Sequence, residues 1–120
     1  MKLIVDEEVK DRFPDLNVLL TEIDSVKVSE YSQELEEFKL EIYDKLRKRY
    51  RLESLKEDPL VKTYRSFFWR IGIDPTKIRP AAEALLRRIL SGRGIPRINT
   101  LVDSYNLASC LLYTSDAADE

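Results

Sequence analysis

The chain has 120 residues, of which 43% are hydrophobic and 35% are charged. This length suits one domain, and no apolar run approaches the roughly 20 residues that span a bilayer. The chain contains no histidine, and its only cysteine is Cys110. Cys/His zinc sites, disulfide scaffolds and Ser-His-Asp triads are therefore excluded within these residues. We expect no metal and no cofactor. Because the N-terminal apolar run is too short for a signal peptide, we also expect a cytoplasmic location.

Charge is distributed unevenly along the chain. Residues 1–60 carry 11 Lys/Arg and 16 Asp/Glu, whereas residues 61–109 carry 9 and 3. The second half is thus strongly basic, which is compatible with a phosphate-bearing partner. A solvated helix face would give the same composition, so charge alone leaves both interpretations open.

The N-terminal third predicts two extended segments and a short helix. Residues 2–5 suit a strand, and Asp6 is placed to cap a helix over residues 7–13. Pro14 breaks this helix. Residues 16–28 alternate apolar and polar positions in part, which predicts a second extended segment.

A long helix is predicted from Ser29 or Ser32 to about Tyr50. Acidic residues gather near its start and basic residues near its end, which suits the helix dipole. The basic end could also touch RNA. Helical spacing predicts a single buried stripe on this helix, formed by Leu35, Phe38, Ile42 and Leu46.

Three further helices are predicted in the basic half. Asp58 and Pro59 have the form of a helix start, and Gly72 would end that helix. Pro80 opens the next helix, which Gly92 ends. Asn99 is a candidate cap for the last one. The buried face expected on the first of these helices consists of Leu60, Tyr64, Phe67, Phe68 and Ile71, with Trp69 outside its centre.

The last eleven residues, 110–120, read CLLYTSDAADE. They resemble the translation of a transposase adapter used in sequencing libraries. We therefore expect a non-native tail at residues 110–120 and the N-terminal portion of one domain at residues 1–109. Two extended segments followed by helices predict an α+β fold, helix-rich here, whose sheet is incomplete because further strands follow.

The residues from Tyr64 to Ser109 resemble the B3/B4 domain of the phenylalanyl-tRNA synthetase β subunit, and most closely its free-standing relatives. The segments that carry the resemblance are EALLRR at residues 83–88, IPRIN at residues 95–99 and LVDSYN at residues 101–106. The residues of the family pattern Pro-x-x-Asn-x-Val-Asp-x-Thr-Asn occur in the same order at Pro96, Asn99, Val102, Asp103 and Asn106, with two residues instead of one between Asn99 and Val102. Tyr105 stands where the synthetase has threonine.

The resemblance implies an editing pocket that hydrolyses tyrosine wrongly attached to the tRNA for phenylalanine. It places Asn106 and Tyr105 at the pocket wall, with Asn99 as a third candidate substrate-binding residue. An asparagine amide can both donate to and accept from a substrate, so the assignment is chemically reasonable. Asn99 could instead serve only as a helix cap. Asp103 could bind nearby backbone or pair with Arg97. The catalytic residues stay unknown.

The densest basic group consists of Arg87, Arg88, Arg93 and Arg97. These arginines are candidates for RNA contacts, and ion pairs within the protein are the competing use. The leading hypothesis is binding of tRNA or aminoacyl-tRNA, with possible hydrolysis of mischarged tRNA in trans. The alternative is a non-catalytic module that binds an amino acid or another small ligand. The segment has no ligase core and no phosphate loop, so we do not expect it to be a ligase alone.

Overall fold

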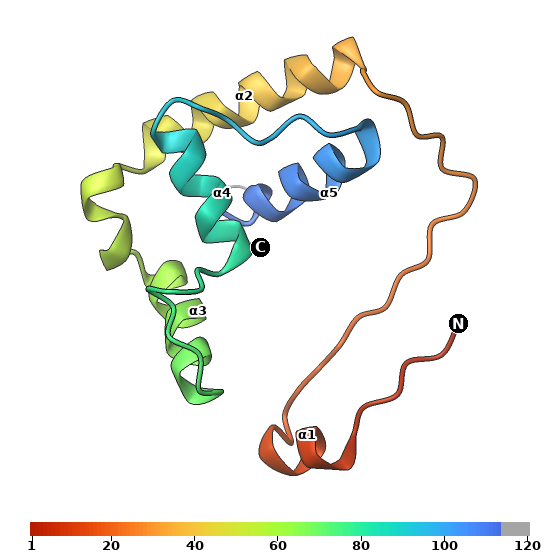
Figure 1. Cartoon of the computed structure of the whole chain (residues 1–120), viewed down its shortest axis with the longest axis vertical. Coiled ribbons are helices and arrows are strands. Elements are labelled where there is room, and N and C mark those ends of the chain that lie inside the picture. The colour runs from red at the N-terminus through yellow and green to blue at the C-terminus, as the bar shows by residue number, and fades with distance from the viewer. Residues whose placement is uncertain (114–120) are drawn as a thin grey trace.

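In a computed structural model, which describes residues 1–113, helices dominate the chain (Figure 1). The elements are α1 (Glu7–Arg12), α2 (Gln33–Arg49), a 3-10 helix η1 (Leu52–Glu57), α3 (Pro59–Arg70), α4 (Ala81–Leu90) and α5 (Thr100–Leu111). No strand occurs among residues 1–113. The segments predicted to be extended at residues 2–5 and 16–28 thus form no strand within this part of the chain. Both segments are extended and rise from the two ends of α1, and neither is part of a ladder within residues 1–113 (Figure 1).

Two long helices begin at side-chain caps, whereas Asp6 precedes α1 without making a side-chain capping bond. The Ser32 side chain accepts a hydrogen bond from the Leu35 amide, so of the two predicted starts of α2 it is Ser32 that caps the helix. The Asp58 carboxylate accepts from two amides at the start of α3, and Pro59 occupies the first turn. Gly72 follows α3 with a φ of 83°, in the left-handed region that favours glycine.

The core lies between α2, α4 and α5, which pack against one another. It contains two fully buried leucines, Leu46 of α2 and Leu86 of α4, together with Leu107 of α5. Cys110 and Tyr113 are also buried there. The non-native origin of residues 110–120 stays a prediction, and residues 114–120 lie outside the described part.

The turn between α4 and α5 is fitted closely to α2. Gly94 has a φ of 73°, and a Cβ atom there would lie 2.8 Å from the Tyr43 ring. The next amide, of Ile95, donates to the Tyr43 hydroxyl at 2.9 Å. A side chain at position 94 would therefore push the turn away from α2, so glycine is required twice, for its backbone angle and for space.

Two predicted buried faces differ from those observed. On α2 the buried residues are Lys39, Ile42, Tyr43 and Leu46, whereas Phe38 is 42% exposed. On α3 only Val61 is buried, and Tyr64 and Phe67 are exposed. The face of α3 expected to enter the core thus stays largely uncovered, because α3 packs mainly on η1.

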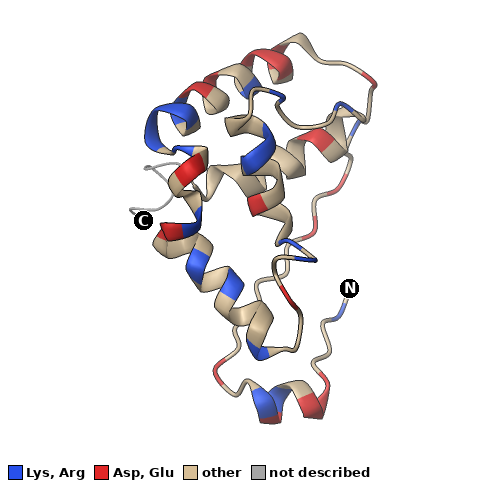
Figure 2. Cartoon of the chain, turned by 60° about the vertical axis from the view of Figure 1, so that its left-hand side comes forward, with Lys and Arg blue, Asp and Glu red and all other residues tan. Residues whose placement is uncertain are grey.

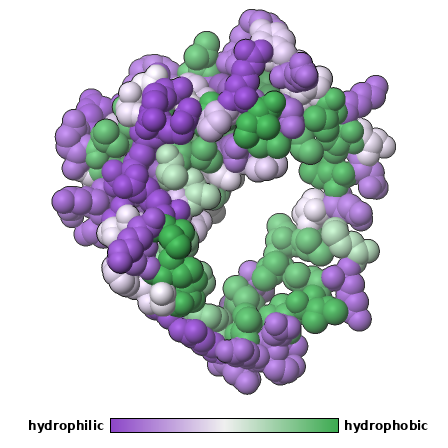
Figure 3. All heavy atoms as spheres, in the orientation of Figure 1, coloured by the Kyte–Doolittle hydropathy of each residue, from purple (hydrophilic) through white to green (hydrophobic). Residues whose placement is uncertain are grey.

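The N-terminal segment, residues 1–31, contacts the helical core at two places, near residues 12–13 and at Ser29. At the first, Phe13 lies 5.6 Å from Phe67, centroid to centroid, and Arg12 donates to the Arg70 carbonyl. At the second, Ser29 and Thr100 exchange two hydrogen bonds, of 2.8 and 2.9 Å. Large apolar residues between these contacts are exposed, and Figure 3 shows the segment as a green-rich arm.

Candidate functional site

The start of α5 is organised by Asn99. Its side-chain oxygen accepts a hydrogen bond from the Val102 amide at 2.8 Å. This confirms that Asn99 caps the helix, as its position before an apolar helix predicted. Because the oxygen is used in this way, the amide nitrogen is the part of Asn99 best suited to meet a ligand.

Tyr105 and Asn106 lie on one side of α5, together with Val102 and Ser109. These four positions are spaced by three and four residues, which places them on a common helix face. Tyr105 is 56% exposed and Asn106 is half-buried. Within residues 1–113 the Asn106 amide makes no hydrogen bond, so both its donor and its acceptor can serve a ligand.

Below this face, Asp103 anchors α5 to α2. Its Oδ2 atom lies 2.8 Å from the Lys39 ammonium, and both side chains are almost completely buried. Its Oδ1 atom accepts from the Ile98 amide at 2.9 Å. Lys39 also contacts Glu36 at 2.5 Å. The expectation that Asp103 binds nearby backbone is confirmed, but its charged partner is Lys39 and not Arg97.

The ionised forms of this pair are the favoured ones. Burial alone would raise the pKa of Asp103, but the hydrogen bonds from Lys39 and from the Ile98 amide outweigh it and lower that pKa. Burial alone would lower the pKa of Lys39, and its bonds to Asp103 and Glu36 raise it instead. A carboxylate held this firmly in its ionised form is suited to positioning α5 and poorly suited to exchanging protons.

A second buried carboxylate, Glu83, joins α3 to α4. Arg65 binds it through two nitrogens, at 2.8 and 2.6 Å, and Arg87 binds it at 2.8 Å. Arg79 approaches to 3.9 Å. Burial would raise the pKa of Glu83, but the bonds from Arg65 and Arg87 outweigh burial, so the pKa is lowered.

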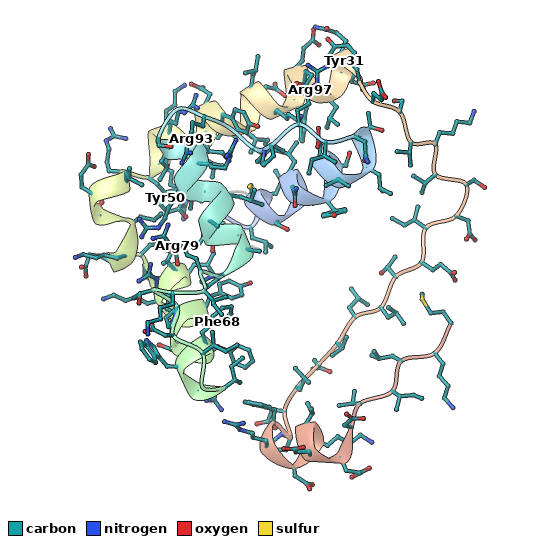
Figure 4. The ribbon with its side chains drawn as sticks, in the orientation of Figure 1. Tyr31, Tyr50, Phe68, Arg79, Arg93 and Arg97 are labelled. Atoms are coloured by element: carbon teal, nitrogen blue, oxygen red, sulfur yellow. The ribbon has the colours of Figure 1, made fainter. Side chains whose placement is uncertain are left out.

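The four arginines proposed for RNA contacts do not form one group. Arg87 is held by Glu83, and Arg88 donates to the Gly94 carbonyl at 2.7 Å. Arg93 lies beside the C-terminal half of α2, whereas Arg97 lies toward its start (Figure 4). There the Arg97 guanidinium stacks 4.6 Å from the Tyr31 ring centroid.

An open groove lies between the end of α2 and the start of α3. It has a cavity volume of about 480 Å³. Its walls carry two tyrosines, a cation, an anion, a hydroxyl and apolar surface; the lining residues are Arg49, Tyr50, Asp58, Pro59, Leu60, Thr63, Tyr64 and Leu112. Neither Asn99, Tyr105 nor Asn106 borders it, so the groove and the α5 face are separate candidate sites.

Sequence reasoning missed Lys39, the Glu83 cluster and the groove. A signal for the first two was present, because residues 61–109 contain only three acidic residues among nine cations. When a basic segment contains few acidic residues, those residues are expected to form ion pairs within the protein. The groove had no sequence signal, since it depends on how α2 meets α3. Among residues 1–113 no group of three His, Cys, Asp or Glu side chains is placed to hold a metal ion.

The described helices thus form a small helical unit fastened by two buried carboxylates and bearing a polar face on α5. Residues 63–114 match the family model of the B3/4 domain. This match confirms the resemblance seen in the sequence, and it covers α4, α5 and residues 63–70 of α3. No curated protein and no solved structure matched the chain. No helix among residues 1–113 is long and apolar enough to cross a membrane.

Proposed function

We propose that this chain contributes to an aminoacyl-tRNA-binding domain of the B3/4 type, which hydrolyses mischarged tRNA in trans in the cytoplasm. The observation that carries the proposal is the family match at residues 63–114, which includes the whole of α5. The resemblance to the synthetase β subunit implies editing of a mischarged amino acid. The Asn106 amide, half-exposed and unbonded within the described residues, supports a role in contacting that substrate.

The chemistry available on the α5 face is recognition by hydrogen bonds. Asn106 can donate to an ester carbonyl or bind a phenolic hydroxyl, and the exposed Tyr105 ring can stack against an aminoacyl side chain. A site that hydrogen-bonds a substrate hydroxyl rejects an analogue that lacks it, because its polar groups are then left unpaired. This is the kind of discrimination an editing domain needs between tyrosine and phenylalanine.

A deacylation assay with the full-length protein tests this function. Tyrosine attached to the tRNA for phenylalanine should be released faster than the uncatalysed background. Asn106→Ala should reduce kcat/KM by about 10- to 100-fold, the loss of one or two substrate hydrogen bonds of roughly 1.5 kcal/mol each. Ser104→Ala, on an exposed position of the same helix, is the matched control. No rate above background with any mischarged tRNA would refute the hydrolase proposal.

The groove between α2 and α3 favours a second candidate function, the non-catalytic binding of an amino acid. Arg49 and Asp58 offer opposite charges in the same groove, and Tyr50 and Tyr64 offer aromatic surface. A free amino acid carries both charges and an adjoining side chain, so its chemistry matches this lining. Asp58 already caps α3, which weakens its share of the charge pairing.

Thermal shift measurements separate the two functions. Stabilisation by a free amino acid that Thr63→Val and Tyr64→Ala remove, with no deacylation of any tRNA, would favour the small-ligand module. Stabilisation by tRNA that high salt abolishes would favour the first proposal.

We further propose that the complete fold is α+β. The exposed apolar residues of the extended segment 16–28, such as Leu19 and Ile23, support this because they would be covered by pairing in a sheet. Hydrogen exchange measured on the full-length protein tests it. Protected amides at alternate positions of this segment are expected, and uniformly fast exchange would refute the sheet.

A further inference from the structure

Two helix ends of the same charge meet at one place in this molecule. Arg47, in the last turn of α2, donates to the carbonyl of Ile89, in the last turn of α4, at 2.9 Å. The turn that follows α4 is held on α2 through Tyr43, as described above. The C-terminal ends of α2 and α4 are therefore neighbours, although they are some 40 residues apart in the sequence.

Basic side chains gather where these ends meet, and Figure 2 shows both as blue stretches of ribbon. From residue 44 to residue 51 the chain has five cations and a single acid, Asp44. From residue 87 to residue 97 it has four arginines and no acid. We call the following residues the α2–α4 basic end: Arg47, Lys48, Arg49, Arg51, Arg88 and Arg93.

Part of this charge serves the protein: Arg51 donates through Nη1 to the carbonyls of Arg47 and Tyr50, and Arg49 donates to the Tyr50 hydroxyl. Arg47 and Arg88 each bind a carbonyl through Nε. A guanidinium has five N–H donors, so each of these arginines keeps its terminal nitrogens for an outside acceptor. Lys48 pairs with Asp44 at 2.9 Å, but both side chains are mostly exposed, so water and salt weaken this bond. The nearest acids in the following 3-10 helix are Glu53 and Glu57, and Lys62 contacts Glu57.

The sequence grouping of arginines is thus replaced by a spatial one. Arg87 leaves the group because Glu83 holds it, and Arg97 lies toward the other end of α2 (Figure 4). Arg88 and Arg93 remain, and the end of α2 supplies the rest. We propose that the α2–α4 basic end is the surface that contacts the phosphate backbone of RNA.

Phosphodiester groups fit this surface for two reasons. Arginine forks bind phosphate oxygens through two parallel hydrogen bonds, and five of the six residues are arginines. The surface is also poor in exposed apolar side chains: among residues 44–52 and 87–95, Leu52 is the one large hydrophobic residue that is exposed. A lipid surface would be expected to take an apolar face in addition to charge.

This inference rests on the proposed function, because it supplies the surface by which a tRNA would be held. Binding of the full-length protein to tRNA is measured across a series of salt concentrations. The triple variant Lys48→Gln, Arg51→Gln, Arg93→Gln removes three cations from the basic end. The control triple Lys27→Gln, Lys62→Gln, Lys77→Gln removes three exposed cations elsewhere, so the change in net charge is the same.

The first triple should reduce the slope of log K against log salt by about two, since each lost phosphate contact removes roughly 0.7 to 0.9. The control should change the slope by less than half as much. Equal slopes for the two triples would overturn the basic end as the RNA surface and leave the proposed function standing. If the first triple variant loses helical circular dichroism, Arg93→Gln alone is tested instead, and the expected change in slope is about one.

Two other outcomes bear on the partner. Wild-type protein that fails to bind tRNA at low salt would overturn the inference, while the deacylation assay judges the proposed function separately. Vesicles containing phosphatidylserine serve as the second probe. If vesicle binding falls in the first triple while tRNA binding does not, the surface recognises a membrane and the RNA assignment is wrong.

Discussion

Asp103 is the residue on which the placement of α5 depends. Its carboxylate satisfies a buried ammonium on α2 and a backbone amide before α5 at the same time. A buried ion pair adds little to stability compared with apolar packing, but removing one partner leaves a charge without compensation. The pair therefore acts chiefly to specify how α5 sits on α2.

We predict that Asp103→Asn lowers the free energy of unfolding by about 3 kcal/mol, the lower end for a broken buried pair, because Glu36 still contacts Lys39. The asparagine oxygen can still accept from the Ile98 amide, so the loss of stability measures the effect of removing the negative charge. Urea unfolding measures it. Asp44→Asn removes an exposed partner of Lys48 and should cost less than about 1 kcal/mol. Equal effects of the two variants would show that Asp103 has no special role.

The buried ion pairs also predict how stability depends on pH. The pKa values of Asp103 and Glu83 are lowered on folding, so their contribution is complete above about pH 4.3 and is lost as pH falls further. The pKa of Lys39 is raised, so its contribution is complete below about pH 10.4 and is lost as pH rises through the folded value. Melting temperatures from pH 3 to 11 should show a plateau with losses at both ends. Maximal stability at pH 3 would contradict this.

At the scale of elements, α5 is defined by its cap. We predict that Asn99→Ala destabilises the protein by about 1 kcal/mol and that Asn99→Ser restores most of it, because serine also caps helices. The same variants separate capping from substrate binding. If Asn99→Ser recovers stability but not deacylation or ligand binding, the amide nitrogen contacts the substrate. Full recovery of both would restrict Asn99 to the cap.

The helices were predictable because their signals are local. Ser32, Asp58 and Asn99 each cap the helix that they precede, and helical periodicity located α2 to α5. Which face is buried was less predictable, since it depends on partners far along the chain. On α2 the buried stripe includes Lys39 instead of Phe38, because Asp103 offers a charge at that position.

The strands and the site show a further limit. Residues 16–28 have a strand-like pattern, but a strand requires a neighbour, which these segments lack within residues 1–113. Tyr105 and Asn106 were named from the resemblance; the structure places both on α5, and their contact with a substrate stays a prediction. The separation of Arg97 from Arg93 could not be read from the sequence, because it follows from the path of the turn along α2.

At the scale of the whole molecule, the core and the N-terminal segment should differ in local stability. The segment between Pro14 and Ser29 contributes no residue to the buried core. Limited proteolysis with trypsin should therefore cut first after Lys27, which is exposed, and leave the region from α2 to α5 intact. Mass spectrometry of the products measures the order. Earlier cleavage within α2 or α4 would show that the helical core is the weaker part.

The two hydrogen bonds between Ser29 and Thr100, which we call the Ser29–Thr100 clasp, depend on the ion pair between Lys39 and Asp103. Ser29 and Thr100 are 71 positions apart, and closing so long a flexible loop would cost more than two exposed hydrogen bonds return. The cost is not incurred, because Lys39 and Asp103 already hold the beginnings of α2 and α5 together. Only the short link from Ser29 to Ser32 then has to be ordered. The effective concentration of Ser29 and Thr100 for each other is thus set by the Lys39–Asp103 contact, in which neither residue takes part. Loss of Asp103 should release the clasp as well, and the two sites should be thermodynamically coupled.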